Sequence, residues 1–184
     1  TTHLTLGTIG VDLTLQPNAA ALTSGFVNGY NPGETWTEQT SGGNHFTGVT
    51  YGNGIFVAVG SAGTILTSPD GSAWTQRTSG ITNAFYGITY GDGTFVAVGE
   101  GGKILTSSDG STWTPRTSGQ NSTLTNVTYA NGKFVTVGNL GIILNSPNGT
   151  TWTPSTSGTT NAFSGITYGD STFVAVGEGG IILT

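Results

Sequence analysis

Residues 87–119 read GITYGDGTFVAVGEGGKILTSSDGSTWTPRTSG, and related forms of this stretch recur along the chain. The units begin near residues 48, 87, 126 and 165, and the last one stops partway, at Thr184. Their tyrosines stand 39 residues apart, at Tyr51, Tyr90, Tyr129 and Tyr168. A fixed period of this length is typical of repeated supersecondary units that bury their faces against one another.

Each unit is predicted to form four short strands, which in the quoted stretch cover residues 88–90, 95–98, 103–106 and 111–114. The sequence Gly91-Asp92-Gly93 between the first two strands is typical of a tight hairpin, because Asp-Gly tolerates positive φ. The second strand is apolar on both faces, so it should be covered on both sides. No segment indicates a helix. The pattern favours a propeller blade; a β-solenoid is the alternative, although its coils are usually shorter.

The two ends of the repeat region are complementary. Residues 33–37, GETWT, match the outer strand at residues 149–153, GTTWT. We therefore expect an all-β fold, a small propeller of four blades with four antiparallel strands each. Residues 31–39 would complete the fourth blade beside the C-terminal strands and close the ring. The competing interpretation is exchange of this strand between chains, which gives a larger ring and an oligomer, because few blades require a strong tilt between neighbours.

Residues 1–30 form a separate arm before the propeller region of residues 31–184. Within residues 1–29, Leu4, Leu6, Val11, Leu13 and Leu15 alternate in part with polar residues, which predicts strands. One interpretation is a strand pair packed on the ring. The other is a docking arm that adds strands to a neighbouring protein of an assembly. The N-terminus lacks the features of a secretion signal, which fits either a mature chain after signal removal or a short product that lost its initiator Met.

The composition excludes several partners. Charged residues make up 7% of the chain and the net charge is −5. Nucleic-acid binding needs a basic footprint, and anionic membranes attract basic segments, so neither is expected. No apolar run approaches the roughly 20 residues of a membrane span. The chain has no cysteine, which rules out disulfides and thiolate metal sites.

The third turn of each unit carries a motif. It reads SPDGSAW at residues 68–74, SSDGSTW at 107–113 and SPNGTTW at 146–152. This motif resembles the Asp-box, or BNR, repeat, although it is one residue shorter between Asp and Trp. Together with FVAVG and GG-x-I-L-T, residues 31–184 are similar to bacterial and phage propellers related to the photosystem II assembly factor propeller. The resemblance implies a propeller with a structural box, in which Asn148 and Pro32 replace the Asp in two of the four positions.

The candidate catalytic residues do not form a set that an enzyme needs. Sialidases carry Asp-boxes and grip a carboxylate with three arginines, whereas this chain has only Arg77 and Arg116. A glycosidase needs two carboxylates in different environments. Glu100 and Glu178 hold equivalent positions in alternate units, where they would face each other across a four-bladed ring. Because identical environments do not separate an acid from a base, we expect no enzymatic activity and no cofactor.

A cation site is a further prediction from the first turns. Asn53, Asp92, Asn131 and Asp170 are ordinary hairpin residues at equivalent positions. In a small ring their side-chain oxygens would gather around the axis, where they could bind a hard cation such as Ca²⁺. The two histidines, His3 and His45, are too few for a transition-metal site.

The linkers between units vary most and suggest binding residues. Amide-rich, uncharged loops suit neutral glycans better than ions. The ligand-binding candidates are Asn44, His45, Asn83, Tyr86, Asn121 and Asn161, with Glu100 and Glu178 beside them. The leading hypothesis is a structural or attachment module in a larger assembly, such as a phage virion (capsid decoration, tail or fibre), that contacts other proteins through residues 1–29. The alternative is a secreted or surface lectin-like module for neutral glycans. The expected location is therefore a virion or the extracellular or cell surface.

Overall fold

The computed structural model describes residues 3–5, 12–14, 36–39 and 41–184. The chain divides into two compact units, Thr1–Glu38 and Gln39–Thr184. In the first unit, strand β1 (His3–Thr5) pairs antiparallel with β2 (Asp12–Thr14), with Leu4 opposite Leu13. The arm thus contains the strands predicted for it.

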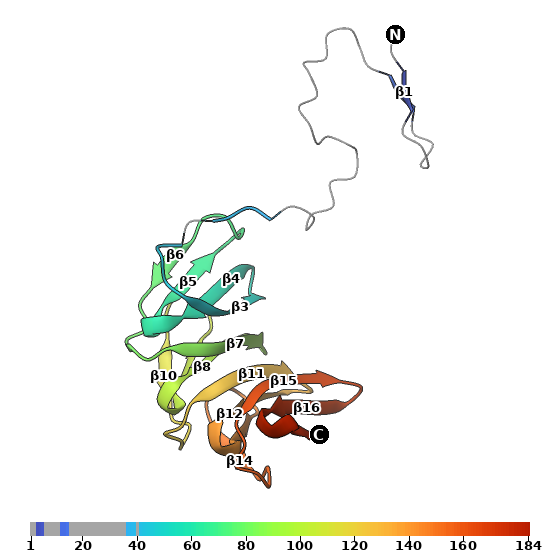
Figure 1. The fold of residues 1–184 in the computed structure, drawn as a ribbon. Coiled ribbons are helices and arrows are strands. Elements are labelled where there is room, and N and C mark those ends of the chain that lie inside the picture. The colour runs from blue at the N-terminus through green and yellow to red at the C-terminus, as the bar shows by residue number, and fades with distance from the viewer. Residues whose placement is uncertain (1–2, 6–11, 15–35, 40) are drawn as a thin grey trace. The chain divides into compact units, whose positions relative to one another are not determined.

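The second unit is a succession of four antiparallel sheets (Figure 1). The first sheet holds β3 (Phe46–Gly52), β4 (Ile55–Gly60), β5 (Ile65–Ser68) and β6 (Thr75–Arg77). The second holds β7 (Phe85–Gly91), β8 (Thr94–Gly99), β9 (Ile104–Ser107) and β10 (Thr114–Arg116). The third holds β11 (Leu124–Ala130), β12 (Lys133–Gly138), β13 (Ile143–Ser146) and β14 (Thr153–Ser155). The fourth holds β15 (Phe163–Gly169), β16 (Thr172–Gly177) and β17 (Ile182–Leu183).

The turns between strands follow the prediction, with one difference. Asp92 and Gly93 join β7 to β8 with φ of 46° and 72°, as expected for a tight hairpin. The short 3-10 turns η1 (Ser61–Gly63), η2 (Glu100–Gly102), η3 (Asn139–Gly141) and η4 (Glu178–Gly180) join the second strand of each sheet to the third. The outermost strand of the second sheet begins at Thr114 rather than at Ser111. Asp109 binds the amides of Ser111 and Thr112 and keeps them in the turn.

The core lies between neighbouring sheets. Strand β3 packs on β7, β7 on β11, and β11 on β15. Val96, Ala97 and Val98 of β8 are all 0% exposed, so the second strand is covered on both faces, as predicted. Val57 of the first sheet and Phe95 of the second belong to one such buried cluster.

These sheets are the blades of a propeller, but the described residues do not show a closed ring. The fourth sheet ends at β17, and no fourth strand pairs with it in the part of the chain described. Residues 36–39 are not in a strand, and residues 31–35 lie outside the described residues. Closure by residues 31–39 therefore stays a prediction. Within the described ranges, no helix is long and apolar enough to cross a bilayer.

Candidate binding surfaces

The repeated turn before each outer strand is held by its own side chains. In the second blade, Ser107 Oγ accepts a hydrogen bond from the Gly110 amide at 2.8 Å. Trp113 Nε1 donates to the Gly110 carbonyl at 3.0 Å, and the Trp113 side chain is 9% exposed. Asp109 Oδ1 accepts from the Thr112 amide at 2.8 Å. The motif residues are therefore occupied in shaping the turn.

Hydrogen bonding to the turn amides also lowers the pKa of two carboxyls. The Thr112 amide, followed by the Ser111 amide, lowers the pKa of Asp109 to about 2. The Ser72 amide is the largest cause for Asp70, whose pKa is also about 2. Asn148 takes the same place in the third blade, and its Oδ1 accepts from Thr150 N at 2.9 Å and Thr151 N at 3.1 Å. The amide in place of Asp thus leaves the turn geometry unchanged.

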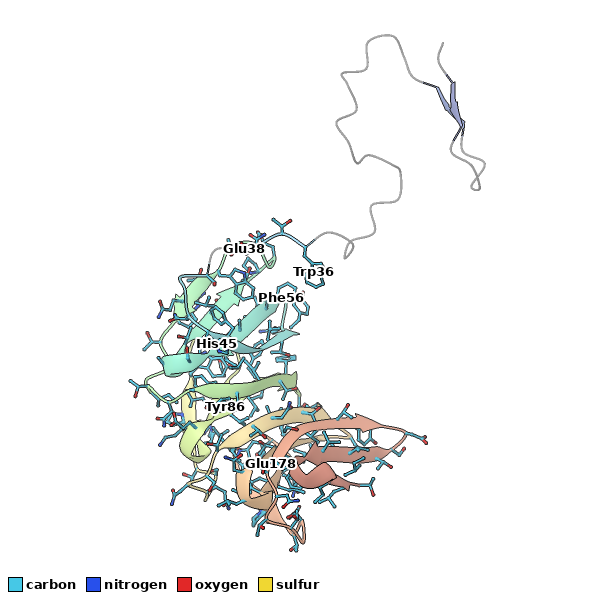
Figure 2. All side chains as sticks on the ribbon, viewed as in Figure 1. Trp36, Glu38, His45, Phe56, Tyr86 and Glu178 are labelled. Carbon is cyan, nitrogen blue, oxygen red and sulfur yellow. The ribbon has the colours of Figure 1, made fainter. Side chains whose placement is uncertain are left out.

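The starts of the first strands line a hollow of about 420 Å³. Thr47, Tyr86, Thr125 and Ser164 stand at equivalent positions there, beside Glu178. Tyr86 is 41% exposed. Figure 2 labels Tyr86 and Glu178, two of the predicted ligand-binding residues that the fold brings into one hollow. Glu100 is not among its lining residues; its Oε2 accepts from the Ala84 amide at 3.4 Å.

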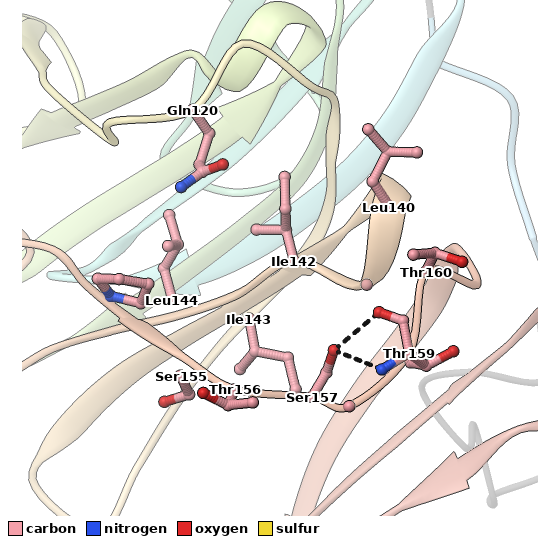
Figure 3. Close-up of a pocket in the computed structure, with 13 residues that line it drawn as sticks. Gln120, Leu140, Ile142, Ile143, Leu144, Ser155, Thr156, Ser157, Thr159 and Thr160 are labelled. Carbon is pink, nitrogen blue, oxygen red and sulfur yellow. Dashed lines mark hydrogen bonds between the residues drawn. The ribbon is translucent and has the colours of Figure 1, made fainter.

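Two larger hollows lie at equivalent linkers. One, of about 780 Å³, is lined by residues 76–83, which include Arg77 and Asn83 and lead from the first blade to the second, and by Lys103. The other, of about 680 Å³, is lined by residues 154–160 with Leu140 and others (Figure 3). In it Ser157 Oγ donates to the Thr159 carbonyl at 3.1 Å and accepts from the Thr159 amide at 3.3 Å. Among the four asparagines predicted to bind a ligand, Asn83 is thus the one that lines a hollow described here.

The other ligand-binding candidates are scattered. Asn44, His45, Asn121 and Asn161 are exposed and do not line these three hollows. The side-chain Nδ2 of Asn161 donates to the backbone carbonyl of Glu178 at 3.1 Å, so this side chain supports the η4 turn. The structure therefore divides the predicted glycan-binding set between separate places.

The predicted cation ligands sit in the hairpin turns where the sequence placed them. Asn53, Asp92, Asn131 and Asp170 are exposed, with φ between 45° and 49°. Asn53 Nδ2 donates to the Ser108 carbonyl of the next blade at 3.3 Å. Among the described residues, no group of three or more His, Asp or Glu side chains is placed to hold a metal ion. The calcium site, which counts amide ligands too, stays a prediction.

Sequence reasoning missed the hydroxyls of the first strands. Thr47 Oγ1 donates to the Phe85 carbonyl of the next blade at 2.6 Å, and Thr125 Oγ1 donates to the Phe163 carbonyl at 2.7 Å. A Thr or Ser at three of the four equivalent positions, Thr47, Thr125 and Ser164, was the available signal. Threonine is abundant along the whole chain, so its recurrence at these positions is not distinctive.

Comparison with known proteins supports the fold. No family model and no curated protein sequence matches the chain. A solved structure of YCF48 bound to D1 peptide is similar with a TM-score of 0.61 at 18% identity, over 73% of this chain and 47% of that one. The computationally designed Ika4 protein is similar with a TM-score of 0.65 at 14% identity, over 79% of this chain and 93% of that one. The chain thus spans about half the length of the first of these proteins, and both likenesses show a β-propeller fold.

Proposed function

We propose that the chain is a non-catalytic structural or attachment module of a larger assembly. The observation that carries this proposal is the β1–β2 hairpin, which belongs to a unit separate from the blades. A two-stranded sheet is marginally stable by itself in water. Its open edges are suited to pairing with strands of another protein. The hairpin therefore supports a docking role for residues 1–29.

The use of polar side chains within the blades also supports a non-catalytic role. Asp70, Asp109 and Asn148 each accept hydrogen bonds from amides of their own turn, which supports the Asp-box assignment. Arg116 Nε donates to Thr106 Oγ1 at 2.8 Å within its own sheet, and Arg77 makes the same bond to Thr67. These groups are engaged in structure and are not directed at a substrate. One similar propeller is known with a bound peptide, which is consistent with a protein partner here.

A phage virion is the assembly that we favour, as a capsid decoration, tail or fibre component. The resemblance of the repeats to phage propellers supports this choice, as does a surface in which hydroxyls and amides replace charges. A virion, or more broadly an extracellular or cell surface, is accordingly the proposed location.

The test is co-sedimentation of the full chain with purified phage virions in a density gradient. Leu13→Pro removes the backbone N–H at a position paired with Leu4, so we expect this variant to be lost from the particle fraction. Leu13→Val keeps the amide and should remain bound. If the full chain stays at the top of the gradient, or if Leu13→Pro sediments like the parent, the docking role is wrong.

A lectin-like function is the second candidate, and the polar linker hollow with Asn83 favours it. Amide and hydroxyl groups there suit the hydroxyls of a neutral glycan. On an array of neutral glycans, saturable binding should weaken at least tenfold in Asn83→Ala and remain in Asn121→Ala, since Asn121 does not line that hollow. Absence of binding to every neutral glycan would contradict this candidate.

A further inference from the structure

The two ends of the row of blades are apolar and uncovered. Val49 of β3 is 62% exposed, whereas the equivalent Ile88 and Val127 in the next two blades are 9% and 4% exposed. At the other end, Ile182 of β17 is 66% exposed, whereas the equivalent Ile104 is 1% exposed. Figure 1 shows β3 and β16 at opposite ends of the row. The first two junctions inside the row bury such residues, so each end of the row exposes apolar side chains of the kind that a junction covers.

The two ends are complementary through a tyrosine and a glycine. A Cβ added to Gly52 would lie 2.1 Å from Tyr90 Cγ, and one added to Gly91 would lie 2.0 Å from Tyr129 Cγ. At two junctions, therefore, a tyrosine ring lies directly on a glycine of the preceding blade. At the ends, Tyr51 is 58% exposed and Gly169 faces open space. Tyr51 therefore lacks a preceding glycine to pack on in its own row, and Gly169 lacks a following tyrosine ring.

The inter-blade hydrogen bond is also incomplete at the end. Thr47 Oγ1 and Thr125 Oγ1 each donate to a carbonyl of the following blade, at 2.6 Å and 2.7 Å. Both hydroxyls also donate to a carbonyl of their own sheet, that of Val59 at 3.3 Å and that of Val137 at 3.2 Å. The equivalent Ser164 Oγ keeps this second bond, to the Val176 carbonyl at 3.4 Å, and has no following blade in its own row. In the pattern of the other junctions, its partner across a new junction would be the Phe46 carbonyl.

The junction between the third and fourth blades has a partly apolar hollow where the first two junctions hold a tryptophan. Trp113 packs in a cluster that includes Val57, Ile65 and Phe95. The equivalent residues two repeats later are Val135, Ile143 and Phe173. They line a hollow of about 390 Å³. The sequence places Trp36 before β3 as Trp113 stands before β11. Trp36 is 93% exposed, whereas Trp113 is 9% exposed.

We propose that a second copy of this chain covers both ends, so that two rows of four blades form one ring of eight. Val49 and Tyr51 of each copy then pack on the β15–β17 sheet of the other. Trp36 of each copy fills the hollow beside Phe173 of the other. Two such junctions, related by a two-fold axis, close the ring. Eight blades lie within the known range for propellers.

Close packing at the internal junctions favours a second copy over closure within one chain. Val57, Phe85 and Phe95 at the first junction are 0% exposed, and so are Val98, Leu124 and Phe134 at the second. β3 and β16 lie at opposite ends of the row in Figure 1, so bringing them together within one chain would require repacking of these junctions, and interiors packed like crystals resist such changes. A second copy needs only two more junctions of the kind already present.

A cysteine pair distinguishes the two kinds of closure. The chain has no cysteine, so Tyr51→Cys combined with Gly169→Cys introduces the only thiols. A Cβ on Gly91 would lie 2.6 Å from Tyr129 Cβ, closer than the roughly 3.5–4.5 Å between the Cβ atoms of a disulfide. A small separation of the two blades would therefore let the equivalent pair form a disulfide. We expect a covalent dimer of twice 18.7 kDa on a non-reducing denaturing gel. Either single variant, as the control, should stay at 18.7 kDa. A disulfide within one chain, or no disulfide, would overturn the proposal.

Solution mass gives an independent test on the full chain. We expect twice 18.7 kDa for the parent and 18.7 kDa for Val49→Glu and for Ile182→Glu, with unchanged circular dichroism. Both side chains are exposed in one row, so the substitutions spare its internal packing. Leu140→Glu is the control, because Leu140 is 66% exposed but belongs to the η3 turn. A monomeric parent, or a Val49→Glu dimer, contradicts the eight-bladed ring. These results do not depend on the hairpin, so they fail or succeed separately from the proposed docking role.

Discussion

The carboxylate of Asp109 accepts a hydrogen bond from the backbone amide of Thr112 at 2.8 Å. This bond and the one from Ser111 stabilise the charged form, and they lower the pKa of Asp109 to about 2 from 3.8. The same arrangement lowers the pKa of Asp70 to about 2. The turn and the charge are thus coupled, which makes blade stability depend on pH.

Acid should destabilise the fold through these turns. A carboxyl with a folded-state pKa below its unfolded value contributes stability above the unfolded pKa and loses it as pH falls through the folded pKa. We therefore expect the melting temperature to fall as pH decreases from about 4 to about 2. Asp109→Asn should reduce this dependence while it keeps the turn, as Asn148 does. Thermal unfolding followed by circular dichroism across this range checks it; an unchanged pH dependence in Asp109→Asn would contradict it.

Removing a box tryptophan should be costly. Trp113 is 9% exposed and packs between two blades. Truncation of a buried Trp to Ala typically costs about 3–5 kcal/mol, and we expect that loss in the free energy of unfolding of Trp113→Ala, measured with urea. Ser108→Ala, at an exposed turn position, is the control and should lie within about 0.5 kcal/mol of the parent. Equal stability of the two variants would show that Trp113 does not hold the junction.

Gly99 should not tolerate alanine. A Cβ there would lie 2.1 Å from the Ala84 carbonyl oxygen. This oxygen also accepts a hydrogen bond from the backbone amide of Glu100 at 2.9 Å. Because the obstacle is backbone, the clash persists unless the start of β7 moves, and we expect a loss above about 3 kcal/mol. Gly119→Ala meets no atom within 4 Å but has φ of 73°, so its cost should be about 1 kcal/mol of strain. Unfolding curves of both variants check this order, and the reverse order would contradict it.

The elements could be predicted from sequence because their determinants are local. Asp92-Gly93 specifies its hairpin through positive φ, and the apolar run of β8 indicates a strand covered on both faces. The start of β10 was predicted three residues early, at Ser111. The threonines and serines of the box look like strand residues, whereas hydrogen bonds to Asp109 keep them in the turn.

The candidate site was harder to predict because it depends on several blades at once. Tyr86 and Glu178 stand far apart in the chain and meet in one hollow. Asn44 and Asn161 hold positions equivalent to Asn83, yet they line none of the hollows described above. Linker sequence indicates polarity but not where a side chain points. The inter-blade bonds of Thr47 and Thr125 depend on the neighbouring sheet and have no local signature.

The sequence by itself determined the repeat, the strands and the turn chemistry, because these depend on residues a few positions apart. Only the tertiary structure decided which copies of the repeat are covered. Val49 and Ile88 hold equivalent positions and similar side chains, yet they are 62% and 9% exposed. Burial requires a neighbouring blade, and the angle between blades is set by side chains from two sheets packing together, a property that no single repeat contains.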